Sequence, residues 1–337
     1  MTLHVAVLPG IHVTRRVFTP ADLERLCALA GKVTLNEAEG NPTPERVKQL
    51  IRGADVAITS WGCPPLTADV LAEAPQLRAV LHAAGSIKTV ITPDCWERGM
   101  DVTGAAGVLS KGVAETALGL TIVSLKNIWA IREHTRTNGW WGFQSDPVRD
   151  RIREMFGTVI GVIGGGHAGR HYIKLLRGFD VQVLLSDPTY TAAQAEELGA
   201  QLVPLEELLA AADVVTVMAP EIPATYRLLN EERFRLMKED AILINPARGS
   251  IIDEEALIRH LKRGRFFACL DVTDPEPPEP DHPLRTLPNV VLTGHIAGAV
   301  NNGLKQIGRF ITLELERYTH GVPMEGRIDP DRLSYLA

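Results

Sequence analysis

The chain has 337 residues, of which 45% are hydrophobic and 23% are charged, a balance typical of globular proteins. This length predicts two domains of ordinary size rather than one core. The net charge of −6 argues against the basic surface of a nucleic-acid-binding protein. The four cysteines are scattered and form no Cys-x-x-Cys pair, so we expect free thiols in a reducing cytoplasm and no metal site.

The first hundred residues alternate short β-rich runs with amphipathic stretches, two of which open with a capping residue and a proline, at Thr43-Pro44 and Thr92-Pro93. Such alternation predicts a parallel sheet covered by helices on both faces, with its binding crevice at the carboxyl ends of the strands. The expected strands are Val5–Leu8, Lys32–Leu35, Val56–Thr59, Ala79–His82 and Met100–Thr103.

The most apolar long stretch is Gly112–Ile131. It contains Glu115, Lys126 and Asn127, so we expect a buried helix rather than a membrane span, and no membrane partner. The N-terminus lacks the basic region and long apolar region of a signal peptide, which favours a cytoplasmic location.

A second alternating run begins at Thr158. Helices are expected between its strands, including Glu254–Lys262, and a last helix is expected from Asn302 to Tyr318. The expected strands are Val159–Ile163, Val181–Leu185, Val214–Met218, Ala241–Ile244, Phe266–Leu270 and Val290–Thr293.

A glycine-rich run, Gly164-Gly165-Gly166-His167-Ala168-Gly169, follows the first of these strands and opens a helix. The Gly-x-Gly-x-x-Gly spacing allows a tight turn, close approach of a pyrophosphate and close helix–strand packing, while the helix N-terminus attracts phosphates. A plain loop remains the alternative. The glycine-rich run alone is weak evidence for a binding site, but its position between a strand and a helix predicts a dinucleotide site.

Asp187 ends the next strand, 23 residues after Gly164. A carboxylate there can accept hydrogen bonds from the adenosine ribose and repels a 2′-phosphate, which favours NAD over NADP. The alternative is that Asp187-Pro188 is only a turn.

The fold class we expect is α/β, with two doubly wound parallel-sheet domains. Residues 106–300 form the Rossmann-type NAD domain, and residues 1–105 with 301–337 form a flavodoxin-like substrate domain. The chain is expected to cross between domains near Gly104–Gly107 and His295–Gly303. The segment Thr135–Met155, with Trp140, Trp141 and Phe143, is either a surface loop or an arm that contacts a second subunit.

Three polar residues follow successive strands of the second half, namely Arg248, Glu276 and His295. A parallel sheet would deliver them to one edge. A guanidinium binds a carboxylate through two hydrogen bonds, an imidazole exchanges a proton with a neighbouring oxygen, and a carboxylate orients the imidazole. Each residue alone has an ordinary explanation, such as a surface ion pair, but the three together predict hydride transfer to a 2-keto acid.

The sequence resembles the D-isomer-specific 2-hydroxyacid dehydrogenases from about Leu3 to the last helix. The resemblance is carried by Val113-Ala-Glu115, the run Gly164–Gly169, Met237–Gly249, Asp271-Val272 with Glu276-Pro277, and Leu287–His295. It implies that Arg248, Glu276 and His295 are catalytic, that Asp271 holds the nicotinamide carboxamide, and that Pro220 lines the adenine side. The cofactor set we assign is Gly164, Gly166, His167, Ala168, Gly169, Asp187, Pro220, Thr225, Ala247, Arg248, Asp271, His295 and Gly298.

Three features depart from the family pattern. Gly294 stands where the family usually has proline before the catalytic histidine. The loop 83–88 (Ala-Ala-Gly-Ser-Ile-Lys) replaces the usual Gly-x-Gly-x-Asp, and Met218 and Glu221 depart from His-x-Pro-Leu. Substrate specificity therefore does not transfer from better-known members.

The expected substrate residues are Arg248, the backbone of Ala84, Gly85 and Ser86, and Trp61. The alternative for Trp61 is a structural role, in which it caps the core of its domain. We expect a short acid such as glyoxylate or hydroxypyruvate, with phosphoglycerate next, and a homodimer. The alternative function is a non-enzymatic NAD-sensing protein of the same fold.

Overall fold

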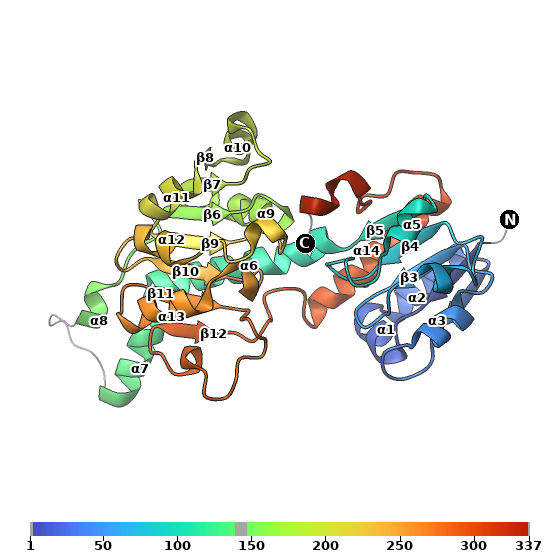
Figure 1. The fold of residues 1–337 in the computed structure, drawn as a ribbon, viewed down its shortest axis with the longest axis horizontal. Helices are drawn as coiled ribbons and strands as arrows, with labels where there is room; N and C mark the ends of the chain where they lie inside the picture. Colours follow the sequence, from blue (N-terminus) through green and yellow to red (C-terminus); the bar gives the residue numbers. More distant parts are fainter. Residues whose placement is uncertain (1–2, 139–146, 336–337) are drawn as a thin grey trace. The chain divides into compact units, whose positions relative to one another are not determined.

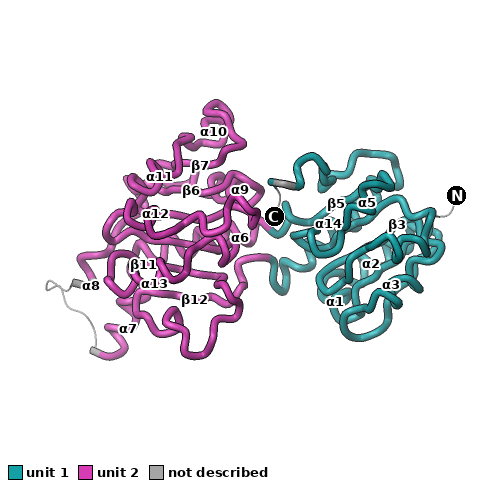
Figure 2. Tube along the Cα trace, in the orientation of Figure 1, with its two compact units in different colours: residues 1–109, 299–337 teal, residues 110–298 magenta. Residues whose placement is uncertain are grey.

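The computed structural model describes residues 3–138 and 147–335, which form two compact units (Figure 2). Unit 1 comprises residues 1–109 and 299–337, and unit 2 comprises residues 110–298. The sequence-based boundaries lie at 105/106 and 300/301. The aromatic residues Trp140, Trp141 and Phe143 fall outside the described residues.

Unit 1 contains a five-stranded parallel sheet in the order β2-β1-β3-β4-β5. This order is that of flavodoxin-like folds. Figure 1 labels strands β3, β4 and β5 of this sheet. Its strands are β1 (His4–Val7), β2 (Lys32–Leu35), β3 (Val56–Thr59), β4 (Ala79–His82) and β5 (Asp101–Gly104). Its helices are α1 (Ile11–Val17), α2 (Pro20–Leu29), α3 (Pro44–Ile51), α4 (Ala68–Leu71), α5 (Pro93–Glu97) and α14 (Asn302–Thr319), with a 3₁₀ helix at Pro330–Tyr335.

Both faces of this sheet are covered. Val5 and Val7 of β1 pack toward α2 and α14, whereas Ala6 of β1 and Leu8, just after it, pack toward α3 and α4. Burial on both faces explains why the inner strands β1, β3 and β4 are mostly apolar.

Unit 2 contains a seven-stranded parallel sheet in the order β12-β11-β10-β9-β6-β7-β8. Counted from β6, this is the Rossmann order with one further strand, so the predicted fold class is confirmed. Its strands are β6 (Val159–Ile163), β7 (Gln182–Ser186), β8 (Gln201–Leu202), β9 (Val214–Val217), β10 (Ile242–Asn245), β11 (Phe267–Leu270) and β12 (Val290–Leu292). Its helices are α6 (Ala106–Leu125, from residue 110), α7 (Ile128–Asn138), α8 (Pro147–Asp150), α9 (His167–Leu176), α10 (Ala192–Leu198), α11 (Leu205–Ala211), α12 (Glu231–Leu236) and α13 (Glu254–Lys262), with 3₁₀ helices at Pro223–Thr225, Gly249–Ile251 and Pro283–Arg285.

The predicted helix Gly112–Ile131 is two helices, α6 and α7. Asn127 separates them with a φ of 50°, a left-handed conformation that asparagine tolerates better than most residues. By length and apolar composition α6 could cross a membrane, a property that it shares with core helices of soluble proteins. Ala114 and Ala117 of α6 lie in the core of unit 2.

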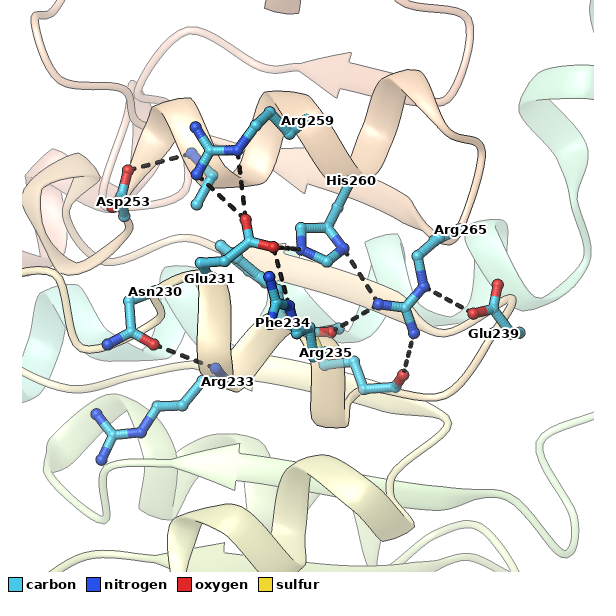
Figure 3. A network of polar contacts seen from close by, with 12 residues as sticks. Asn230, Glu231, Arg233, Phe234, Arg235, Glu239, Asp253, Arg259, His260 and Arg265 are labelled. Carbon is cyan, nitrogen blue, oxygen red and sulfur yellow. Dashed lines mark hydrogen bonds and ion pairs between the residues drawn. The ribbon is translucent and has the colours of Figure 1, made fainter.

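A polar network joins α12 to α13 in unit 2 (Figure 3). Nδ1 of the buried His260 accepts a hydrogen bond from Arg265 Nη1 at 3.1 Å, and its Nε2 lies 3.2 Å from Glu231 Oε1. Because a guanidinium only donates, Nε2 carries the proton and the ring is neutral. Arg259 also donates to Glu231, at 3.1 Å, so the network holds α12 and α13 together.

Candidate active site

Four neighbouring strands of unit 2 end at one edge of the sheet, since β9, β10, β11 and β12 are consecutive and parallel. The loop after β9 carries Glu221, and the loop after β10 carries Arg248. The loop after β11 carries Asp271 and Glu276, and His295 follows β12. The sheet thus brings the predicted trio to a single edge.

Glu276 and His295 are in direct contact. His295 Nδ1 lies 2.5 Å from Glu276 Oε1, and both side chains are partly exposed. The carboxylate is an acceptor, which places the ring proton on Nδ1 and leaves Nε2 for an external partner. This is the geometry in which a carboxylate orients an imidazole and stabilises its protonated form.

The buried Asp271 holds the chain on both sides of His295. Its Oδ1 accepts hydrogen bonds from Thr293 Oγ1 at 2.5 Å and from the Ile296 amide at 2.9 Å, and its Oδ2 accepts one from the Ala297 amide at 2.9 Å. The His295 amide donates to the Asp271 carbonyl at 2.7 Å. Three donors therefore occupy the carboxylate, and Oδ2 keeps an acceptor position for a ligand.

The backbone before His295 explains the departure from the family pattern. Gly294 has a φ of 72° and His295 a φ of 60°, so both lie in the left-handed region. Proline fixes φ near −65° and cannot occupy position 294 with this backbone. The path that the chain takes here therefore excludes proline and favours glycine.

Arg248 is held by its own loop and by Glu221. Its Nη1 donates to the Ala247 carbonyl at 2.7 Å, and its Nε lies 3.9 Å from Glu221 Oε2. The Asn245 side chain donates to the Arg248 carbonyl and accepts from the Ala247 amide, which fixes the turn after β10. Within the described residues, Arg248 makes no hydrogen bond or ion pair with Glu276 or His295.

The glycine-rich run has the close approaches that its spacing predicts. A Cβ on Gly164, whose φ is 100°, would lie 2.7 Å from the Ala219 nitrogen, and one on Gly169 would lie 2.0 Å from the Gly164 oxygen. In contrast, nothing lies within 4 Å of a Cβ built on Gly166, and no side chain caps the helix α9 that begins there. The amides of His167 and Ala168 open this uncapped helix, so the space and the N–H groups fit an anionic pyrophosphate.

Asp187 is a structural part of the same loop. It accepts hydrogen bonds from the Gly165 amide at 2.7 Å and from the Thr189 amide and hydroxyl at 2.8 and 2.6 Å. Tyr190, which sequence reasoning missed, donates its hydroxyl to the Gly165 carbonyl at 2.7 Å and packs its ring against Gly165. Only the general tendency of turns to follow such strands could have indicated Thr189 and Tyr190.

The remaining predicted cofactor residues lie in loops of unit 2. The Thr225 hydroxyl donates to the Pro220 carbonyl at 2.6 Å and thereby closes the loop after β9. The carbonyl of Gly298 lies 3.2 Å from the Cβ that Gly112 would carry, so this segment packs on α6. No group of three or more His, Cys, Asp or Glu residues that could hold a metal ion occurs in the described part of the chain.

The predicted substrate residues outside Arg248 belong to unit 1. Trp61 follows β3 and is 43% exposed. The loop after β4 is held by Ser60, whose hydroxyl donates to the Ala83 carbonyl at 2.8 Å. In the described residues, the amides of Ala84, Gly85 and Ser86 donate no hydrogen bond, so three donors remain available.

His82 precedes this loop and was not singled out from the sequence. Its Nδ1 lies 2.8 Å from Thr59 Oγ1, and burial lowers its pKa to about 4. The ring is therefore neutral near pH 7.

Comparisons with known proteins identify the family of the chain. Residues 118–297, more than half of the chain, match the NAD binding domain of the D-isomer specific 2-hydroxyacid dehydrogenases. The chain is 31% identical over 284 residues to a glyoxylate reductase of Korarchaeum cryptofilum, which covers 84% of this chain and 85% of that protein.

Two further proteins extend the comparison. The chain is 32% identical over 281 residues to a D-3-phosphoglycerate dehydrogenase of Methanocaldococcus jannaschii, covering 83% of this chain but about half, 52%, of that protein. The solved structure of the TT0316 protein from Thermus thermophilus matches with a TM-score of 0.77 and 29% identity, covering 97% of this chain and all of the other. With its NAD-binding Rossmann unit, this chain belongs to the D-isomer specific 2-hydroxyacid dehydrogenases, which are NAD-dependent oxidoreductases.

Proposed function

We propose that this protein interconverts a short D-2-hydroxy acid and its 2-keto acid, with glyoxylate or hydroxypyruvate as the substrate and phosphoglycerate as the second candidate. The contact of 2.5 Å between Glu276 and His295, on the same sheet edge as Arg248, carries the proposal. The names of similar proteins, glyoxylate reductase and D-3-phosphoglycerate dehydrogenase, support the same range of acids.

The three side chains divide the chemistry of keto-acid reduction. Arg248 binds the carboxylate of the acid and polarises the adjacent keto oxygen. His295 gives a proton from Nε2 to that oxygen and takes it back in the reverse direction, while Glu276 stabilises the protonated imidazole through Nδ1. Bound NADH supplies the hydride.

The residues around the glycine-rich run would hold the dinucleotide. The amides at the start of α9, including His167 and Ala168, would bind the pyrophosphate, and Asp187 would bind the adenosine ribose. The carboxylate of Asp187 disfavours NADP. The other residues assigned to the cofactor are Pro220, Thr225, Ala247, Asp271 and Gly298.

Unit 1 would contribute to binding of the acid. The uncommitted amides of Ala84, Gly85 and Ser86 suit a carboxylate, and Trp61 would limit the size of the acid. Replacing Trp61 with alanine should then raise KM for glyoxylate more than it lowers kcat.

The decisive experiment is NADH oxidation with a panel of 2-keto acids, followed by ultraviolet absorbance. Wild type should reduce at least one short acid, and His295→Ala should lose at least 100-fold in kcat/KM because general acid catalysis contributes about 10²–10⁴. His320→Ala, on an exposed histidine at the end of α14, is the matched control. Tight NADH binding without turnover of any acid would favour the NAD-sensing alternative instead.

We also propose a cytoplasmic homodimer that pairs through α6 and α7; the segment Trp140–Phe143, expected to take part, lies outside the described residues. The 44% exposure of the apolar Ile128 at the start of α7 supports this. Light scattering at working concentrations should give twice the monomer mass of 36.8 kDa. A monomer would refute the pairing and leave the enzymatic proposal untouched.

A further inference from the structure

Glu221 is a further charged residue at the sheet edge that carries the trio, and the proposed mechanism does not use it. It lies in the loop after β9, and Arg248 lies in the loop after the neighbouring strand β10. Its Oε1 accepts a hydrogen bond from Ser250 Oγ at 2.6 Å, while its Oε2 lies 3.9 Å from Arg248 Nε. Ser250 thus aims one oxygen of the carboxylate at the guanidinium.

Of the three guanidinium nitrogens of Arg248, these contacts involve two. Nε faces Glu221, and Nη1 donates to the Ala247 carbonyl at 2.7 Å. Nη2 donates no hydrogen bond within the part of the chain that the structure describes, so it remains available to an acid. Glu221 therefore restrains the rotation of the guanidinium and partly offsets its positive charge.

We propose that Glu221 positions Arg248 and selects acids that carry a single negative charge. The inference rests on the proposed function, because it needs Arg248 to bind the carboxylate of the substrate. One carboxylate of the acid binds Nη2 of the guanidinium, and any second negative group then lies in the field of the Glu221 carboxylate. Short monoanionic 2-keto acids are the preferred class, and 2-keto diacids are disfavoured.

The size of the effect follows from Coulomb's law. If a second charge on the acid lies about 9 Å from the Glu221 carboxylate, an effective dielectric constant between 20 and 80 gives a penalty of roughly 2- to 20-fold in affinity. Both side chains are partly exposed, at 57% for Glu221 and 41% for Arg248, so the expected value is about fivefold. It should decrease as salt is added.

The test compares two acids of equal carbon number, 2-ketobutyrate with one negative charge and oxaloacetate with two. Each acid is measured as an inhibitor of the best substrate of the panel. The ratio of the two inhibition constants then compares their binding without requiring turnover of either acid. Glu221→Gln keeps an oxygen for Ser250 but removes the charge, so it should shift this ratio about fivefold toward oxaloacetate at low salt. Glu206→Gln, which removes an exposed charge paired with Arg233 elsewhere in unit 2, should leave the ratio unchanged.

A third variant separates positioning from charge. Glu221→Leu loses both contacts, so it should lower kcat/KM for the best substrate beyond the effect of Glu221→Gln, without weakening NADH binding. An unchanged ratio in Glu221→Gln, in an enzyme whose wild type reduces 2-keto acids, overturns the charge selection. Equal kcat/KM in the Leu and Gln variants overturns the positioning role, and a wild type inactive on every acid overturns the proposed function itself.

Discussion

Replacing Gly294 with proline would restore the residue usual in the family, yet it should disable this protein. Gly294 has a φ of 72°, whereas proline requires a φ near −65°. The chain between Thr293 and Ala297 would have to take another path. It would then lose the hydrogen bonds that the amides of His295, Ile296 and Ala297 donate to Asp271.

The expected loss can be estimated from these contacts. Three hydrogen bonds at about 1 kcal/mol each give a destabilisation of about 3 kcal/mol, which lowers the Tm of a unit of this size by roughly 6–12 °C. Because His295 would also move away from Glu276, kcat/KM should fall about 100-fold or more.

Alanine at the same position isolates the backbone cost. Nothing lies within 4 Å of a Cβ on Gly294, so Gly294→Ala should cost only the left-handed penalty of about 1 kcal/mol. Gly264 has a φ of 70°, is equally open and lies beyond α13, so Gly264→Ala should lose the same stability with full activity. Scanning calorimetry and NADH oxidation measure both properties. A Gly294→Pro variant with near wild-type activity and a Tm no lower than that of Gly294→Ala would refute the reasoning.

Three further predictions concern single side chains. Asp187→Asn lacks the charge and keeps only one acceptor oxygen for the loop amides, so the ratio of kcat/KM for NADH over NADPH should fall about tenfold; an unchanged ratio contradicts the role of Asp187. Glu276→Gln should lower kcat/KM for keto-acid reduction 10- to 100-fold, because a neutral amide no longer stabilises the positive charge that the His295 ring carries during proton transfer. The pKa of His82, lowered to about 4 by burial, means that the unfolded chain binds the extra proton first as the pH falls below about 6.5. Unit 1 should therefore lose up to about 3 kcal/mol between pH 7 and pH 4, and His82→Asn should reduce this dependence in urea unfolding curves.

Strands and capped helices could be predicted because their signals are local. β3, β4 and β6 have the predicted bounds because buried parallel strands are mostly apolar runs, and α13 has them because the Asp253 side chain caps it. The edge strand β2 also has the predicted bounds, although it is not fully buried. The two-residue strand β8 was missed because Gln201 and Leu202 show no periodicity, and pairing with β7 alone makes them a strand.

Some contacts of the site could not be predicted from the sequence, because they form between loops that follow different strands. The sequence places Glu276 and His295 after strands that turn out to be adjacent, so their meeting could be expected. Glu221 was noticed only as a departure from the family pattern. Its pairing with Arg248 and Ser250 depends on the positions of two loops that no local pattern describes.

Asp271 shows how the local and long-range parts of the site depend on each other. The family resemblance assigns this residue to the nicotinamide, but its side chain is only 3% exposed and three donors from residues 293–297 already bind it. A buried carboxylate is stable only with such partners, and the left-handed backbone at Gly294 and His295 persists only where surrounding contacts hold it. The buried carboxylate and the left-handed turn stabilise each other, because the turn brings the amides of residues 296 and 297 within hydrogen-bond distance of the carboxylate. The backbone path through His295 is therefore held by a residue 24 positions earlier in the chain, which explains why the motif can change from proline to glycine while the contact with Glu276 remains.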